Sequence, residues 1–149
     1  MHFSAEEAQL LKKSLVKIRN CSEAPGIFYD HLFRVSPDAQ SLFIGDLSRQ
    51  GEKLIDAIAF IIEHINHWSE STAEIEEMGL RHVAYGVLPE HYVSAGEALD
   101  QMLSEVLAGD YTPETRSVWS KVYLELSTIM LRAIDSRKSV AVLEENGAI

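Results

Sequence analysis

The chain has 149 residues, of which 46% are hydrophobic and 24% are charged, a composition typical of a single soluble globular domain. Its net charge of -10 argues against nucleic acid or an anionic membrane surface as a partner, because both require a basic patch. The single cysteine, Cys21, excludes an intrachain disulfide, and without a signal-peptide pattern or an apolar run long enough to cross a bilayer we expect a cytoplasmic protein.

Amphipathic helices account for nearly the whole chain, and no alternating strand pattern occurs. Ser4 and Glu7 have the spacing of a capping box and predict a first helix that ends near Asn20. A second helix is expected from about Pro25, because proline is favoured in the first turn of a helix. Pro37, which follows a serine, then predicts a short helical turn.

A longer helix is expected over residues 47–65, and the polar segment HWSEST at 67–72 is expected to be a loop. The next helix carries His82 on its apolar face. It should end soon after this residue, because Gly86 and then Pro89 break the helical pattern.

Two long helices complete the pattern, one beginning at Pro89 and the other at Pro113. The short turn between them predicts that they pack antiparallel. Because the pattern fades afterwards, we assign residues 1–136 to one domain and residues 137–149 to an extension or mobile tail. The sequence thus predicts an all-α fold of about six to seven helices.

Three polar side chains lie on apolar helix faces, namely Tyr29, Gln50 and His82. Each has a simple structural explanation: a core tyrosine, a half-exposed glutamine, and a core histidine that bonds a backbone carbonyl. Together they also fit a flat cofactor lying between the helix of Gln50 and the helix of His82. The imidazole would then ligate the cofactor's metal, and the other two side chains would offer hydrogen bonds from the opposite side.

Five segments, in order along the chain, resemble a known family. They are FYDHLF at 28–33, SPDAQSLF at 36–43, RQGEKL at 49–54, LRHVAYGVLPEHY at 80–92 and WSKVY at 119–123. The sequence resembles globins over roughly residues 11–133, and among globins it is most similar to single-domain bacterial haemoglobins and the haem domain of flavohaemoglobins. This resemblance implies a globin fold packed around a haem pocket.

By this resemblance, His82 is the proximal ligand of the iron in haem b, and Tyr29 and Gln50 are distal hydrogen-bond donors to the bound gas. Other residues that the resemblance places around the haem are Phe43, Lys53, Leu54, Val87 and Tyr92. Two such donors are expected to slow the loss of O2.

The sequence departs from flavohaemoglobins in two ways. Those proteins continue into a reductase, whereas this sequence stops at Ile149, so we expect that any reduction of the iron needs a separate reductase. They also place a glutamate in the proximal network, where an alignment from Trp119 puts Ile134. Asp135 is one residue out of phase and therefore turned by about 100° around the helix. This departure favours ligand binding over catalysis.

We therefore expect reversible binding of O2, and of NO or CO, at a five-coordinate iron in a monomer or homodimer, as in oxygen transport or storage. The alternatives are a nitric oxide dioxygenase acting with a separate reductase, a haem-based gas sensor, and a haem-free globin fold that serves as an interaction module. His64 and His67 could share a metal, although no further ligand is evident. His91 could approach the edge of the haem, although we expect it to be solvated.

Overall fold

The computed structural model describes the backbone of residues 3–145 and the side chains of residues 3–136. Over this range the chain forms α-helices and short 3-10 segments and no strand, so the predicted all-α fold is confirmed. The elements are α1 (Ala5–Arg19), α2 (Ala24–Val35), η1 (Pro37–Leu42), α3 (Leu47–Glu63), α4 (Trp68–Ala84), α5 (Pro89–Leu107), η2 (Ala108–Asp110) and α6 (Pro113–Glu145). Among these described helices, none is both long enough and apolar enough to span a membrane.

Most helix starts agree with the sequence signals. At α1 the Glu7 N–H donates to the Ser4 hydroxyl at 3.1 Å, and the Ser4 N–H donates to the Glu7 carboxylate at 2.9 Å, so the predicted capping box is confirmed. The helix α2 begins one residue before Pro25, and η1 begins at Pro37. These starts are set by local chemistry, which is why the sequence reveals them.

The loop predicted at residues 67–72 is wrong, because α4 already begins at Trp68. The hydroxyl of Ser71 donates to the His67 carbonyl at 3.3 Å, and that of Thr72 donates to the Trp68 carbonyl at 3.0 Å. These bonds to the preceding turn satisfy the small polar side chains within the helix. The polar residues of this segment therefore do not interrupt α4.

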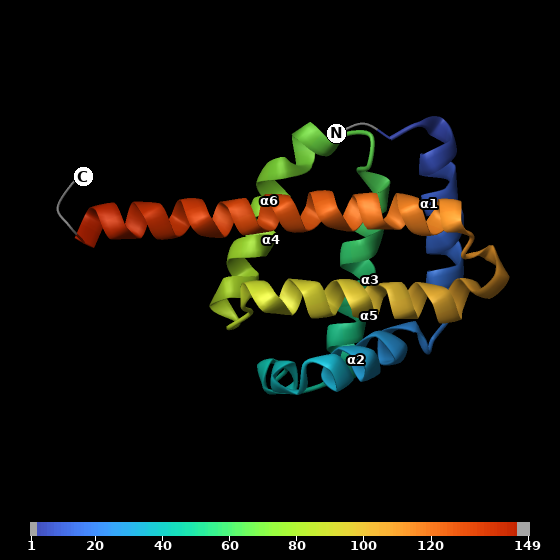
Figure 1. The fold of residues 1–149 in the computed structure, drawn as a ribbon, viewed down its shortest axis with the longest axis horizontal. Coiled ribbons are helices and arrows are strands. Elements are labelled where there is room, and N and C mark those ends of the chain that lie inside the picture. The colour runs from blue at the N-terminus through green and yellow to red at the C-terminus, as the bar shows by residue number, and fades with distance from the viewer. Residues whose placement is uncertain (1–2, 146–149) are drawn as a thin grey trace.

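Figure 1 shows α5 and α6 running in opposite directions, as predicted from the short turn between them. Close backbone packing also joins α2 to α5 and α4 to α6. The last part of α6 extends past α4 and away from the other helices. The predicted domain boundary at residue 136 falls inside this helix and stays a prediction, and residues 146–149 lie outside the described part of the chain.

Two glycines allow the close helix crossings that position the candidate site. A Cβ atom on Gly79 would lie 2.8 Å from the Cα and the carbonyl oxygen of Met130, so α4 and α6 touch through their backbones. A Cβ atom on Gly51 would lie 2.8 Å from Cβ of Pro25, where α3 crosses α2. Any side chain at either position would push the two helices apart.

Both tryptophans of the chain are buried in the helical body. The Trp68 ring lies 6.4 Å from the Phe3 ring, measured between centroids, at the start of α4. The indole N–H of Trp119 donates to the Ser14 hydroxyl at 3.1 Å, and this hydroxyl donates to the Leu10 carbonyl at 2.8 Å. The second contact ties α6 to α1 through a satisfied polar chain inside the core.

Candidate functional site

His82 lies in the last turn of α4, half-buried, with its Nδ1 atom 2.7 Å from the Met78 carbonyl oxygen. A carbonyl can only accept a hydrogen bond, so Nδ1 carries the proton and Nε2 keeps the lone pair. Burial is the main cause that lowers the pKa of His82; the positive charge of Arg81 acts in the same direction, and the bond to Met78 opposes both. The imidazole is therefore a neutral base whose Nε2 atom can ligate a metal.

The end of α4 is fixed by a glycine turn. Gly86 has a φ angle of +93°, which residues with a Cβ rarely adopt. Its N–H donates to the Val83 carbonyl at 2.9 Å, and the N–H of Val87 donates to the His82 carbonyl at 3.0 Å. The predicted end of this helix soon after His82 is thus confirmed, and the chain turns sharply from His82 into α5.

Tyr29 and Gln50 lie together where α2 meets α3. The buried hydroxyl of Tyr29 donates to the backbone carbonyl of Gln50 at 3.0 Å. Burial raises the pKa of Tyr29 to about 12, so the phenol keeps its proton. The half-buried side-chain amide of Gln50 forms no hydrogen bond with any of the described residues. The two predicted distal donors are therefore neighbours, but the proton of one is used by the backbone of the other.

Phe43 follows η1 and belongs to an aromatic cluster on the same side. Its ring centroid lies 5.1 Å from that of Tyr29 and 5.5 Å from that of Phe33, both in edge-to-face geometry. Phe43 is half-buried and packs against the core. The aromatic cluster therefore fixes the end of η1 relative to Tyr29.

The remaining predicted pocket residues divide by exposure. Leu54 on α3 and Val87 after α4 are half-buried and contact the core, whereas Lys53 is exposed. The structure therefore places Leu54 and Lys53 on the helix that carries Gln50, and Val87 shortly after the helix that carries His82.

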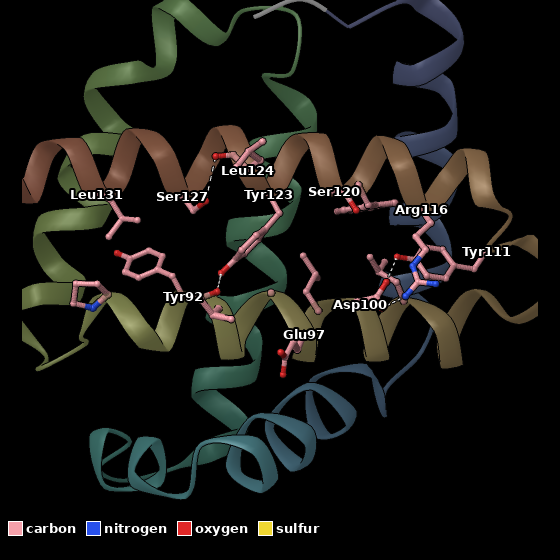
Figure 2. A pocket seen from close by; sticks show the side chains of 16 residues that line it. Tyr92, Glu97, Asp100, Tyr111, Arg116, Ser120, Tyr123, Leu124, Ser127 and Leu131 are labelled. Atoms are coloured by element: carbon pink, nitrogen blue, oxygen red, sulfur yellow. Dashed lines mark hydrogen bonds and ion pairs between the residues drawn. The ribbon is translucent and has the colours of Figure 1, made fainter.

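Tyr92 lies in the first turns of α5, and its ring points toward Leu131 of α6 (Figure 2). Its hydroxyl is buried and has no hydrogen-bond partner among the described residues, and burial raises its pKa. Ile134 is buried and Asp135 is exposed, as the phase argument predicted. No carboxylate of α6 therefore serves this hydroxyl within the described part of the chain.

Tyr123 contacts the same segment in a different way. Figure 2 shows its hydroxyl donating to the backbone carbonyl of Tyr92. The Tyr123 ring also lies against Gly96, where an added Cβ would approach a ring carbon to 2.9 Å. Tyr123 therefore fixes the start of α5 against α6, a role that sequence periodicity alone did not reveal.

The expectation that His91 is solvated is wrong, since the residue is only 6% exposed. The Leu88 N–H donates to Nδ1 of His91 at 2.9 Å, and Nε2 of His91 lies 2.8 Å from a carboxylate oxygen of Asp38. One sequence signal could have indicated that His91 caps the start of α5. His91 stands at the third position of this helix, and the cap residue, Leu88, has no polar side chain.

The pair His64 and His67 gains no further ligand. Nδ1 of His64 lies 2.8 Å from the Phe60 carbonyl oxygen, and His67 lies 3.8 Å from the carboxylate of Glu70. No group of three or more metal-ligating side chains occurs among the described residues. His82 would therefore be a single protein ligand, as in a haem site.

The corners next to the start of α3 and the end of α4 carry exposed apolar side chains. Over the described residues the backbones of α3 and α4 make almost no contact with one another. Large apolar side chains are exposed at the corners that flank these helices: Ile44 at 88%, Leu47 at 43%, Tyr85 at 63% and Leu88 at 48%. The two corners adjoin, because a Cβ on Gly86 would lie 3.3 Å from a methyl carbon of Leu42. An apolar group placed here would cover these side chains.

Two grooves lie on the described part of the chain. One, of about 520 Å³, lies between α5 and α6, and Asp100 at its far end binds both Tyr111 and Arg116 (Figure 2). The other, of about 690 Å³, is lined by Tyr29, Gly26 and Ile55 among others. His82 lines neither of them; of the predicted site residues, Tyr92 lines the first groove and Tyr29 the second.

Comparisons with known proteins identify the family. The model of the globin family matches residues 27–130. Flavohemoproteins of Vibrio cholerae and Bordetella pertussis are 26% and 28% identical over 82% and 86% of this chain. The chain spans about a third of the length of these curated relatives, 31% and 33%.

Solved structures agree with this result. An engineered carbene transferase, made from a candidate nitric oxide dioxygenase of Rhodothermus marinus, matches with a TM-score of 0.78 and 28% identity over 96% of this chain and 99% of its own. A bacterial globin of Campylobacter jejuni matches with a TM-score of 0.77 and 19% identity over 91% of this chain and 99% of its own, which supports the fold. The resemblance read from the sequence is confirmed, and the chain belongs to the globin family.

Proposed function

We propose that this globin holds haem b through His82 and thereby binds O2 reversibly, with NO and CO as competing ligands. Membership of the globin family implies haem as the cofactor. The observation that carries the proposal is the state of His82: Nδ1 is bound to the Met78 carbonyl, and Nε2 keeps a lone pair on a neutral ring. A backbone bond of this kind orients a metal-ligating imidazole and raises its basicity.

The predicted pocket residues have the chemistry needed to hold a flat apolar group. The divergence of α3 and α4 and the exposed apolar corners support a site for such a group between the two helices. Phe43, Leu54, Val87 and Tyr92 would supply its apolar walls, and exposed Lys53 would approach a propionate at the edge. A core histidine without a cofactor would leave these apolar corners uncovered.

A haem iron with one histidine ligand leaves a position open to O2, NO or CO. On the distal side, the Gln50 amide is the donor that needs no rearrangement, because no described residue binds it. One charge-polarised bond of about 1–2 kcal/mol would slow the loss of a partly negative ligand by roughly five- to thirty-fold. Tyr29 holds the backbone of Gln50 in place and can donate to a ligand only after that bond breaks.

A nitric oxide dioxygenase is the second candidate, and it is favoured by the flavohemoprotein relatives and by the Rhodothermus neighbour. This activity would require electrons from a reductase. The proximal side argues against efficient catalysis. Ile134 is aligned with the position expected for a carboxylate, and the Tyr92 hydroxyl has no partner among the described residues. Turnover of NO with an added reductase distinguishes the two candidates.

The first test is hemin titration of the purified protein, followed by spectra of the ferric, dithionite-reduced, O2-exposed and CO-exposed forms. We expect a Soret band and a stable oxygenated form in the wild type and in His64→Ala. His82→Ala should lose the five-coordinate ferrous spectrum while its helical circular dichroism remains. A helical wild-type protein that forms no Soret band, or a His82→Ala variant with the wild-type spectrum, would overturn the proposal.

A further inference from the structure

His91 is a buried histidine that the proposed ligand chemistry does not use. Both of its nitrogens have fixed partners. The Leu88 N–H can only donate, so Nδ1 of His91 accepts at 2.9 Å and carries no proton. The Asp38 carboxylate accepts, so Nε2 carries the proton and donates at 2.8 Å. The two bonds define one tautomer of a neutral ring with no free hydrogen-bonding atom.

The first bond closes the corner after the predicted iron ligand. Leu88 is the cap residue of α5 and has no polar side chain, so its N–H would remain unsatisfied without His91. Only five residues separate His82 from Leu88, and the Gly86 turn lies between them. The imidazole therefore fixes the direction in which the chain leaves α4.

The second bond anchors this corner to η1, on the other side of the candidate site. Asp38 also accepts a hydrogen bond from the buried Ser36 hydroxyl at 2.8 Å. The bond to His91, followed by that to Ser36, lowers the pKa of Asp38, so the carboxylate stays charged. At its end η1 leads into Phe43, which packs on Tyr29.

We propose that His91 is a positioning residue for the haem site, because it clamps the corner between α4 and α5 onto η1 and so sets the distance between His82 and Phe43. A second contact supports the clamp: Gly86 approaches Leu42 of η1 so closely that an added Cβ would lie 3.3 Å from its methyl carbon. This inference rests on the proposed haem function. It assigns to His91, which lies outside the proposed haem site, a part in setting the geometry of that site.

The test compares His91→Leu, which removes both bonds, with His91→Gln, whose amide can accept from Leu88 and donate to Asp38. His64→Leu is the matched control, because His64 is half-buried and bonds only a carbonyl of its own helix. Amide hydrogen exchange of residues 85–91 is measured on the apoprotein, which reports the clamp without haem. Transfer of haem to apomyoglobin and the iron–histidine stretching band of the ferrous form are measured on the loaded protein.

We expect His91→Leu to speed exchange at the corner and haem loss by about tenfold each, since two hydrogen bonds disappear, and to shift or broaden the iron–histidine band. His91→Gln should restore most of each value, and His64→Leu should change none. Faster exchange with wild-type haem loss and an unchanged band would overturn the inference, because the clamp would then be structural only. If the wild type itself takes up no haem, the proposed function fails and this inference fails with it, a result visible before any variant is made.

Discussion

The two sides of the candidate site differ in how their polar groups are used. On the side of α4, α5 and α6, the His82 ring is neutral and oriented, and its helix is pressed onto Met130 through Gly79. On the side of α2, η1 and α3, the Tyr29 proton is bound by a backbone carbonyl. The proposed ligating side is therefore arranged in advance, whereas on the proposed distal side a bond must be exchanged before Tyr29 could act on a ligand.

The largest effect is expected where helices touch through their backbones. Gly79→Ala should lower the free energy of unfolding by about 2–3 kcal/mol, because the new Cβ meets backbone atoms of Met130 at 2.8 Å. Gly51→Ala, on the distal side, meets only the ring of Pro25 and should cost less. Urea unfolding of the apoproteins compares the two, and Gly26→Ala is the control because open space surrounds that position. Equal costs at both crossings would show that neither side is the more rigid.

The tyrosines of α5 and α6 should give effects of opposite sign. Tyr92→Phe removes a buried hydroxyl that has no partner and should stabilise the protein by about 1 kcal/mol. Tyr123→Phe removes a bond to the Tyr92 carbonyl and should destabilise it by about 1 kcal/mol. Thermal unfolding of both variants checks the signs. A loss of stability in Tyr92→Phe would mean that the hydroxyl has a partner in solution.

On the distal side, stability and ligand release should respond to different residues. Tyr29→Phe should cost about 1 kcal/mol of stability in the apoprotein, because the Gln50 carbonyl loses its donor. Gln50→Ala should leave stability within about 0.5 kcal/mol, since no described residue binds its amide, yet it should speed the release of O2. Stopped-flow release of O2 and urea unfolding separate these roles. Faster release in Tyr29→Phe than in Gln50→Ala would place the Tyr29 proton on the ligand.

The smallest effect on stability is expected at Asp38, whose bond to His91 joins η1 to the corner between α4 and α5. The pKa of Asp38 is lowered in the folded protein, so its charged carboxylate stabilises the fold at pH values above the ordinary pKa of an aspartate. This stabilisation is lost as the pH falls through the lowered pKa. Asp38→Asn should therefore flatten the fall in melting temperature of the apoprotein between about pH 5 and pH 3. Near neutral pH, Asp38→Asn should have a lower melting temperature than the wild type. Parallel curves for the two proteins would show that Asp38 titrates alike in the folded and unfolded states.

The features that the sequence predicted well are those set by neighbours along the chain. The capping box of Ser4 and Glu7, the start near Pro25 and the end of α4 just before Gly86 each depend on a few adjacent residues. The segment from Trp68 was misread because hydroxyls that usually favour loops bond instead to the preceding turn.

The contacts that complete the candidate site join residues far apart in the sequence. The Tyr29 hydroxyl reaches a carbonyl 21 residues away, and His91 reaches a carboxylate 53 residues away. A periodic pattern identifies which face of a helix is buried, but it does not identify the atom across from a given side chain. Tyr29, Gln50 and His82 could therefore be singled out as polar residues on apolar faces, while the bond that uses the Tyr29 proton could not.

The burial of both tryptophans has a practical consequence. Trp68 lies at the start of α4 and Trp119 lies in α6, and both are buried inside the helical body. Indole emission overlaps haem absorption, so energy transfer should quench this fluorescence when haem enters and restore it when haem leaves. The protein thus contains its own optical reporter, and the release rates of every variant can be followed without an attached dye.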